Sequence, residues 1–300
     1  MSSIQLIGLL QRSAWSLPRL GAIALLALLA GCEGDVTVDM TTEAPANPNI
    51  TQVQARVRGL EFTGSSGTET LEFTDPQPLD FMDYALDDNT FRLFTSEKLP
   101  EGRYTGVRLL FEDDQDEDEA FVVVTGNNSG TFPMNLAAGE SASIDFEFED
   151  NDSQSEAFTL MLDLRQSLSF DDDNDEYTLT PVLRAVRTED IGTIQGNLTV
   201  SCPAGDTLIT GAVYLFQGQD ITPDDLDGAG VEPFATSPVF TSNNNTSFFY
   251  SLRVLPEGNY TMAATCIGND DDPASDEDLE FRNIVNVELD EGEVLNRDLP

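Results

Sequence analysis

The sequence predicts an all-β protein made of two β-sandwich domains. Three observations favour this class: apolar residues alternate with polar ones over many short stretches, clusters of Gly, Asn, Asp and Ser separate these stretches, and a seven-residue motif occurs twice. Alternation with a period of two is typical of half-buried strands, and the polar clusters are typical of turns. Beyond the N-terminal residues, no stretch has the apolar period of an amphipathic helix.

The clearest alternation lies in the first half of the chain. At residues 53–57, Val, Ala and Val alternate with Gln and Arg, and at residues 144–148, Ile, Phe and Phe alternate with acidic residues. Turn-forming clusters lie between such stretches, at residues 64–67, 127–130 and 171–175. Short strands separated by turns at this spacing are typical of a sandwich.

The repeated motif divides the chain. Residues 99–105 read LPEGRYT, and residues 255–261 read LPEGNYT. Pro and Gly two residues apart favour a β-turn, after which the tyrosine begins a strand. A tyrosine at such a corner can bind nearby backbone through its hydroxyl, as in immunoglobulin-like domains, although a ligand site at each tyrosine is the alternative. The two copies predict similar sandwiches of immunoglobulin-like or prealbumin-like type, at residues 49–190 and 191–300.

The N-terminus has the order of a signal peptide: Arg12 and Arg19, an apolar run over residues 20–30, and small residues before Cys32. The run is too short to cross a bilayer, which takes about 20 helical residues. Residues 29–32, Leu-Ala-Gly-Cys, resemble the lipobox of bacterial lipoproteins. The resemblance implies a signal peptide at residues 1–31, cleavage before Cys32, and fatty acid such as palmitate on that cysteine. An ordinary secretory signal that happens to contain a cysteine is the alternative.

The residues after Cys32 bear on location and on the first domain. By resemblance to enteric lipoproteins, Glu33 in place of Asp favours the outer over the inner membrane of the cell envelope. Residues 32–48 are mostly polar and contain two prolines near their end, so we expect a lipidated tether. The alternation of Val36, Val38 and Met40 also fits a strand.

The composition restricts partners and chemistry. With 14 basic and 55 acidic residues the chain has a formal net charge of −41, which repels phosphates and excludes nucleic acid as an expected partner. Such a charge suits solubility in a saline medium, and it also suits calcium. The absence of histidine excludes Ser-His-Asp and Cys-His sites and the imidazole ligands of zinc. Carboxylate pairs of the kind that glycosidases use occur by chance among so many acids. We therefore expect no enzyme and no cofactor, with Ca²⁺ as the one candidate ion.

Two of the three cysteines are free to pair. If Cys32 carries lipid, Cys202 and Cys266 remain as an even pair in an oxidising compartment, which predicts a disulfide. Two buried free thiols are the alternative.

Acidic loops are the candidate calcium sites, because hard cations prefer carboxylate oxygens. The foremost candidate follows Cys266, and its ligands would be Asp270, Asp271, Asp272, Asp276 and Asp278. Residues 113–119 form a second acidic run. Residues 171–176 form a third, which fails the EF-hand template because Glu176 stands where a Gly is needed, and which fits a polar hairpin loop. A solvated loop is the alternative at each position.

Residues 35–187 resemble the bacterial lipoprotein domain of unknown function 4382. The likeness rests on six segments, at residues 42–45, 53–57, 99–104, 107–110, 121–124 and 177–184. It implies lipid anchoring, an envelope location and a β-sandwich-like fold, with no activity or site. Three further segments look like a carboxypeptidase-regulatory or prealbumin-type sandwich, at residues 192–200, 211–215 and 255–261.

Together these features predict a lipid-anchored, non-enzymatic binding or structural module with a protein or glycan partner. A calcium-dependent adhesion or carbohydrate-binding surface protein is the alternative. The sequence predicts no oligomeric state.

Overall fold

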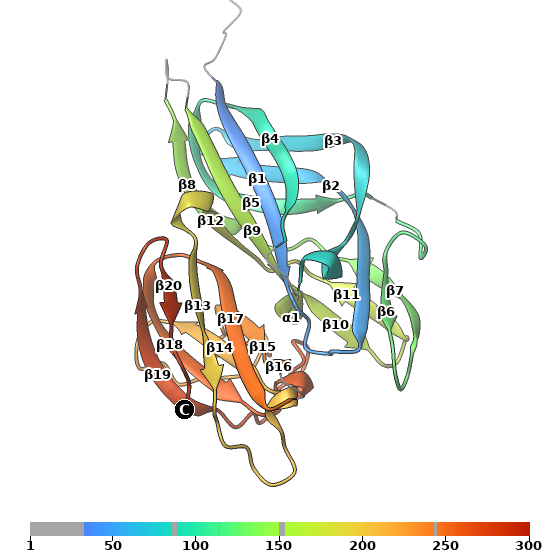
Figure 1. Ribbon diagram of the computed structural model, residues 1–300. Coiled ribbons are helices and arrows are strands. Elements are labelled where there is room, and N and C mark those ends of the chain that lie inside the picture. Colours follow the sequence, from blue (N-terminus) through green and yellow to red (C-terminus); the bar gives the residue numbers. More distant parts are fainter. Residues whose placement is uncertain (1–32, 86–88, 114, 150–153, 243–244) are drawn as a thin grey trace, which may run out of the picture. The chain divides into compact units, whose positions relative to one another are not determined.

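The computed structural model describes residues 33–300, apart from residues 86–88, 114, 150–153 and 243–244. The predicted signal peptide and the predicted lipidation at Cys32 lie outside the described residues. Residues 31–300 form one compact unit. Within it, four sheets form two sandwiches, which confirms the predicted all-β class (Figure 1). The helices described in this unit are all too short or too polar to cross a membrane.

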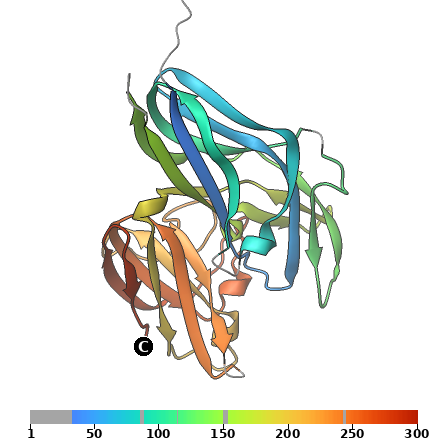
Figure 2. The same ribbon diagram turned by 45° about the horizontal axis from the view of Figure 1, so that its top comes forward.

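The N-terminal sandwich packs a four-stranded sheet on a larger one (Figure 2). The smaller sheet has the order β12 (Leu183–Arg187), β9 (Ser155–Asp163), β1 (Glu33–Glu43), β4 (Phe91–Pro100). The larger sheet has the order β10 (Leu168–Asp171), β11 (Glu176–Leu179), β7 (Gly130–Leu136), β6 (Phe121–Val124), β2 (Ile50–Gly64), β5 (Gly102–Phe111), β8 (Ala142–Phe148), with β3 (Gly67–Asp80) also paired to β2.

The expected tether is wrong, because the segment after Cys32 forms β1 at the centre of a sheet. β1 pairs parallel to β9 on one side and antiparallel to β4 on the other. Val36, Val38 and Met40 are at most 1% exposed, as their alternation allows. The polar residues Thr42 and Glu43 at the end of β1 are buried as well. Thr42 lies there between Phe81 and Arg253, with which it forms hydrogen bonds. Polar composition therefore misled the prediction, whereas the two-residue period was the correct signal.

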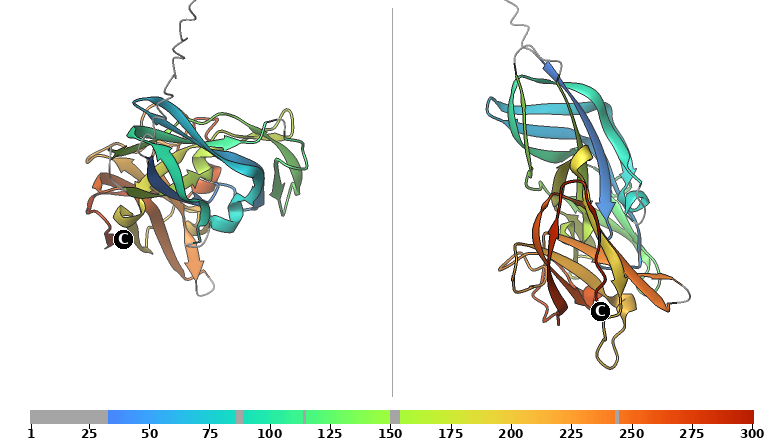
Figure 3. Two further views of the ribbon diagram at one scale, coloured as in Figure 1. Left: turned by 90° about the horizontal axis from the view of Figure 1, so that it is seen from above. Right: turned by 60° about the vertical axis from the view of Figure 1, so that its left-hand side comes forward.

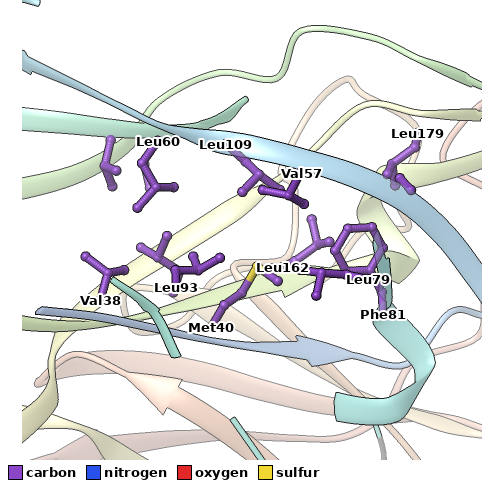
Figure 4. Close-up of a cluster of buried hydrophobic side chains, with 14 of the residues drawn as sticks. Val38, Met40, Val57, Leu60, Leu79, Phe81, Leu93, Leu109, Leu162 and Leu179 are labelled. Carbon is purple, nitrogen blue, oxygen red and sulfur yellow. The ribbon is translucent and has the colours of Figure 1, made fainter. Parts of the chain in front are cut away.

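Apolar side chains from the facing sheets form the N-terminal core. Figure 4 shows Val38, Met40, Leu93 and Leu162 from the smaller sheet beneath residues of the larger sheet such as Leu60. Burying a side chain of this size contributes roughly 1.5–3 kcal/mol. Alternate residues of β2 and β8 point into this core, which explains the period seen in their sequences.

The C-terminal sandwich consists of two four-stranded sheets (Figure 3). One has the order β16 (Phe240–Ser242), β17 (Ser247–Leu255), β13 (Gly192–Leu198), β20 (Val294–Asn296). The other has the order β15 (Ala235–Pro238), β14 (Ala212–Gln217), β18 (Gly258–Thr265), β19 (Arg282–Leu289). Its core draws on residues 194–299, whereas the N-terminal core draws on residues 36–179. Cys202 and Cys266 are joined at the edge of this core, which confirms the predicted disulfide.

Helical turns serve as connections. The α-helix α1 (Leu164–Ser167) begins at Asp163, whose side chain accepts a hydrogen bond from the Gln166 amide. This contact satisfies one of the amide groups that a helix start leaves without a partner. The part of the chain that the structure describes also has short 3-10 helices at Phe81–Tyr84, Thr188–Asp190, Leu208–Thr210 and Gly268–Asp270.

Candidate functional site

The foremost predicted calcium loop lies between β18 and β19, and its members differ in burial. Asp271 is only 2% exposed, whereas Asp270, Asp276 and Asp278 are exposed. A second loop, between β14 and β15, meets it and brings in Asp225, which is 3% exposed. The two loops therefore share a buried contact. The sequence of either loop by itself does not predict this contact.

Carboxylates from both loops come together. One oxygen each of Asp225, Asp271 and Glu277 lies within 4.8 Å of the others, and Asp225 forms a second such group with Asp227 and Asp276. The predicted ligands Asp271 and Asp276 thus belong to a group. Glu277 belongs to the same predicted acidic loop, whereas Asp225 and Asp227 were not predicted, although they lie in an acidic run at residues 224–227.

The remaining predicted ligands, Asp270, Asp272 and Asp278, belong to neither group. Asp272 Oδ1 instead accepts a hydrogen bond from the Ala274 amide at 3.0 Å, so Asp272 is part of a local turn. Acidic residues that are adjacent in the sequence therefore do not all lie together in the structure.

Hydrogen-bond donors already occupy these buried carboxylates. The Tyr214 hydroxyl donates to Asp271 Oδ2, and the Leu226 amide donates to Oδ1 at 3.1 Å. The Glu277 amide donates to Asp225 Oδ2 at 2.5 Å. Burial raises the pKa of Asp271, while the hydrogen bonds from Tyr214 and Leu226 and the nearby Arg165 guanidinium oppose the rise. The arrangement holds the two loops to β14.

The other acidic runs form turns. Asp171 pairs with Glu176 across the β10–β11 hairpin and accepts the amides of Asp173 and Asn174, which confirms the hairpin interpretation of residues 171–176. In residues 113–119, Asp114 lies outside the described residues. Neither run contributes a member to the carboxylate groups found among the described residues.

A charged cluster is buried where the two sandwiches meet. Arg184 on β12 lies 3.3 Å from Asp163 Oδ2, and both side chains are at most 5% exposed. Arg184 also donates to the carbonyl oxygens of Phe234 at 3.1 Å and Arg253 at 3.3 Å, both in the C-terminal sandwich. Buried charges are tolerated when paired and hydrogen-bonded, so this arginine joins the sandwiches through specific contacts.

Arg253 makes the reciprocal connection from β17. Its Nη2 donates to the carbonyl oxygens of Thr42 at 2.8 Å and Ala85 at 3.2 Å in the N-terminal sandwich. Val254, the next residue, has a φ of 51°, which is rare for a β-branched side chain. It packs against Met161 and Val186 in a small apolar cluster at the same place.

The outer face of the β16–β17–β13–β20 sheet carries a different set of side chains. Its strand register aligns Phe240, Phe249 and Asn197 in one row. Ser251, Gln195 and Asn296 form the next row. We call these six residues the amide–aromatic face.

A surface hollow of about 480 Å³ lies over the amide–aromatic face. The rings of Phe240 and Phe249 stack with centres 5.4 Å apart. The Gln195 amide nitrogen donates to Asn296 Oδ1 at 3.2 Å, and the Asn197 amide nitrogen donates to Asp298 Oδ1 at 3.1 Å. Because the members of this face come from four separate strands, the sequence gives no local signal for it.

Comparisons with solved structures give only distant likenesses. The TIE protein of Bacillus anthracis is 12% identical at a TM-score of 0.21, over 89% of this chain and 34% of that one, so the chain spans about a third of its length. A candidate cell adhesion protein of Bacteroides fragilis is 10% identical at a TM-score of 0.22, over 88% and 92%. A fimbrial protein of Bacteroides ovatus is 8% identical at 0.18, over 90% and 48%. We draw neither fold nor function from likenesses this weak.

No curated protein matches the sequence. One family does match, and the match begins at the first residue of β1 and ends at residue 181, just before β12. This agrees with the resemblance noted from the sequence for that part of the chain. That family is a domain of unknown function, DUF4382, and its model matches residues 33–181 of the chain.

Proposed function

We propose that this protein is a lipid-anchored, non-enzymatic binding module of the cell envelope, and that the amide–aromatic face is its binding surface. The observation that carries the binding role is the hollow over that face, where the exposed Phe249 and the half-buried Phe240 stack beside neutral hydrogen-bonding groups. Ligand sites commonly combine aromatic contact area with a few placed polar groups. The net charge of −41 supports a partner other than nucleic acid.

The anchor is supported by the lipobox-like residues 29–32 and by the position of β1. Because β1 begins at Glu33, a lipid on Cys32 would hold the N-terminal sandwich close to the bilayer. The start of β1 lies at the end of the N-terminal sandwich remote from β16 and β17 (Figures 1 and 3). In that arrangement the amide–aromatic face would lie far from the membrane, where a ligand can reach it. We propose the outer membrane as the location.

Labelling with palmitate tests the anchor. The natural chain should incorporate label and need detergent for release, whereas Cys32→Ser should do neither, because several acyl chains anchor stably. The Cys202→Ser/Cys266→Ser double variant keeps Cys32 and is the matched control, which should still be labelled. Membrane retention of Cys32→Ser equal to that of the natural chain would contradict the anchor.

Calcium binding is a second candidate, favoured by the convergence of Asp225, Asp271 and Glu277. Carboxylate oxygens are the ligands that calcium takes, and a bound ion would replace some of the hydrogen bonds that these oxygens now accept. Calcium should then raise the melting temperature of the protein above its value in EDTA, and Glu277→Gln should remove the rise. Asp270→Asn, at an exposed acid outside the groups, is the control. Equal melting temperatures with calcium and with EDTA would leave the cluster a purely structural contact between two loops.

A further inference from the structure

We propose that the amide–aromatic face binds a neutral saccharide. This inference rests on the proposed binding role and adds the chemical class of the ligand. Four properties of the face support it: the placement of its residues, its aromatic pair, its free hydrogen-bonding groups and its lack of acidic residues.

The face is rigidly built. Its residues lie on paired strands, where aligned side chains stand on one side of the sheet about 5 Å from their neighbours. Alternate residues of the same strands, including Tyr250, Leu252 and Ile194, are at most 1% exposed and belong to the core. The Tyr250 hydroxyl on β17 donates to the carbonyl oxygen of Arg297, which holds β17 to the segment after β20. A ligand would therefore meet a preformed surface, which lowers the cost of binding.

The aromatic pair offers a flat apolar platform. Phe249 is 40% exposed and is the one aromatic member among the exposed large apolar side chains of the described residues. Phe240 stacks on it with an angle of 23° between the rings. A cross-strand aromatic pair by itself contributes only about 0.2–1 kcal/mol to the sheet. An aromatic face in water is also a surface on which the C–H face of a sugar ring can lie, because both are apolar and nearly flat.

Neutral polar side chains lie beside the aromatic pair on the same face of the sheet. Within the described residues, the hydrogen bonds leave Gln195 Oε1, Asn296 Nδ2 and Asn197 Oδ1 available. Ser251 adds a hydroxyl in the same row as Gln195. Together they present both donors and acceptors, as the hydroxyl groups of a sugar require. A purely apolar partner, such as the face of a second copy, would leave these groups without hydrogen bonds, at a cost for each.

The charges at the hollow favour a neutral ligand over an ionic one. The chain has 55 acidic residues, yet none of the described residues that line the hollow is acidic. Arg253 is the charged residue at its edge, and its Nη2 already donates to Thr42 and Ala85. A cation would therefore find no carboxylate in the hollow, and an anion would be repelled by the net charge of −41. A hollow of about 480 Å³ is within the usual range of small-molecule sites, about 300–1,000 Å³, so it suits a short saccharide segment.

Affinity electrophoresis tests the proposal with the full chain in a detergent without a sugar head group. Gels contain one of several neutral polysaccharides, namely glucan, mannan, xylan or galactan, or an acidic one such as alginate. We expect at least one neutral polysaccharide to retard the natural chain, and Phe249→Ala to weaken the retardation at least tenfold in apparent affinity. Asn197→Ala should weaken it as well, because it removes a hydrogen-bonding group. Ile284→Ala, at an exposed apolar residue on β19, is the control that should leave it unchanged.

Three results would overturn the proposal. The first is the absence of retardation by any neutral polysaccharide, and the second is retardation that Phe249→Ala and Asn197→Ala leave intact although both variants melt like the natural chain. The third is a dimer of the natural chain that Phe249→Ala converts to a monomer, since a second copy would then cover the face. Retardation by alginate alone, lost in Phe249→Ala, would refute the neutral ligand but keep the face as the binding surface. Palmitate labelling tests the anchor separately.

Discussion

The hydroxyl of Tyr260 donates a hydrogen bond to the carbonyl oxygen of Pro256, 2.8 Å away. Tyr104 makes the same contact with Pro100, at 2.9 Å, in the first copy of the repeated motif. The predicted tyrosine corner is therefore confirmed in both sandwiches, where it ties the turns β4–β5 and β17–β18 to the strands that follow. Burial raises the pKa of both tyrosines to about 12, which keeps each hydroxyl protonated as a donor.

Removing either corner hydroxyl should destabilise the fold. Tyr104→Phe and Tyr260→Phe should each lower the free energy of unfolding by about 1–2 kcal/mol, because the proline carbonyl loses its partner. Urea unfolding followed by circular dichroism measures the change. Tyr84→Phe is the control and should change stability by less than about 0.5 kcal/mol. Corner variants that unfold at the same urea concentration as this control would refute the structural role of the motif.

The disulfide should contribute strongly to stability. It closes a loop with a sequence separation of 64 residues, which in the chain-entropy model is worth roughly 4 kcal/mol. The Cys202→Ser/Cys266→Ser double variant should therefore unfold at a much lower urea concentration than the natural chain. Mass spectrometry without reduction should find the natural chain lighter by two hydrogens than its reduced form. Equal masses before and after reduction would contradict the bond.

Glu43 should make stability depend on pH. It is 1% exposed, its Oε2 has no hydrogen-bond partner, and burial raises its pKa from 4.5 to about 8. Asp163 adds to the rise, and Arg253 and Arg184 oppose it. Between pH 4.5 and 8 the folded state holds a proton that the unfolded chain has released, so the contribution of this group to stability falls as pH rises through that window.

Glu43→Gln isolates this effect, because glutamine keeps the shape and does not titrate. The variant should be more stable than the natural chain by about 1–3 kcal/mol at pH 8, and the difference should shrink toward pH 5. Urea unfolding at several pH values measures it. A difference that is constant from pH 5 to pH 8 would show that Glu43 does not titrate in that range.

The buried pair of Arg184 and Asp163 should be far more important than a surface pair. Arg184→Met should lower the free energy of unfolding by about 3–5 kcal/mol, because it leaves the Asp163 charge buried without its partner. Arg187→Met is the matched control on the same strand. Arg187 is 36% exposed and lies 3.0 Å from Glu156, so its loss should cost less than about 1 kcal/mol. Similar decreases in the free energy of unfolding in the two variants would mean that the buried pair stabilises the protein no more than a surface pair does.

Local patterns were sufficient for much of the fold. The period of two at residues 53–57 and 144–148 identified β2 and β8, and the repeated LPEG turns identified the two corners. The same period was present in β1, but the polar composition of this segment and the two prolines that follow it led to the wrong prediction of a tether. Strand alternation is a property of neighbouring residues and can be read from them, whereas the position of a strand at the centre or edge of a sheet depends on partners far along the chain.

The candidate sites depended on such distant partners. Asp225 meets Asp271 only because two loops fold against β14, and Phe240, Asn197 and Asn296 share a face only because β16, β17, β13 and β20 pair in one register. Burial likewise separates Asp271 from the exposed Asp270 beside it. Residue types and their spacing were thus enough to establish the all-β class, the disulfide pair and the lack of histidine chemistry. Strand pairing and burial, which act over the whole chain, selected the residues that stand together at a surface.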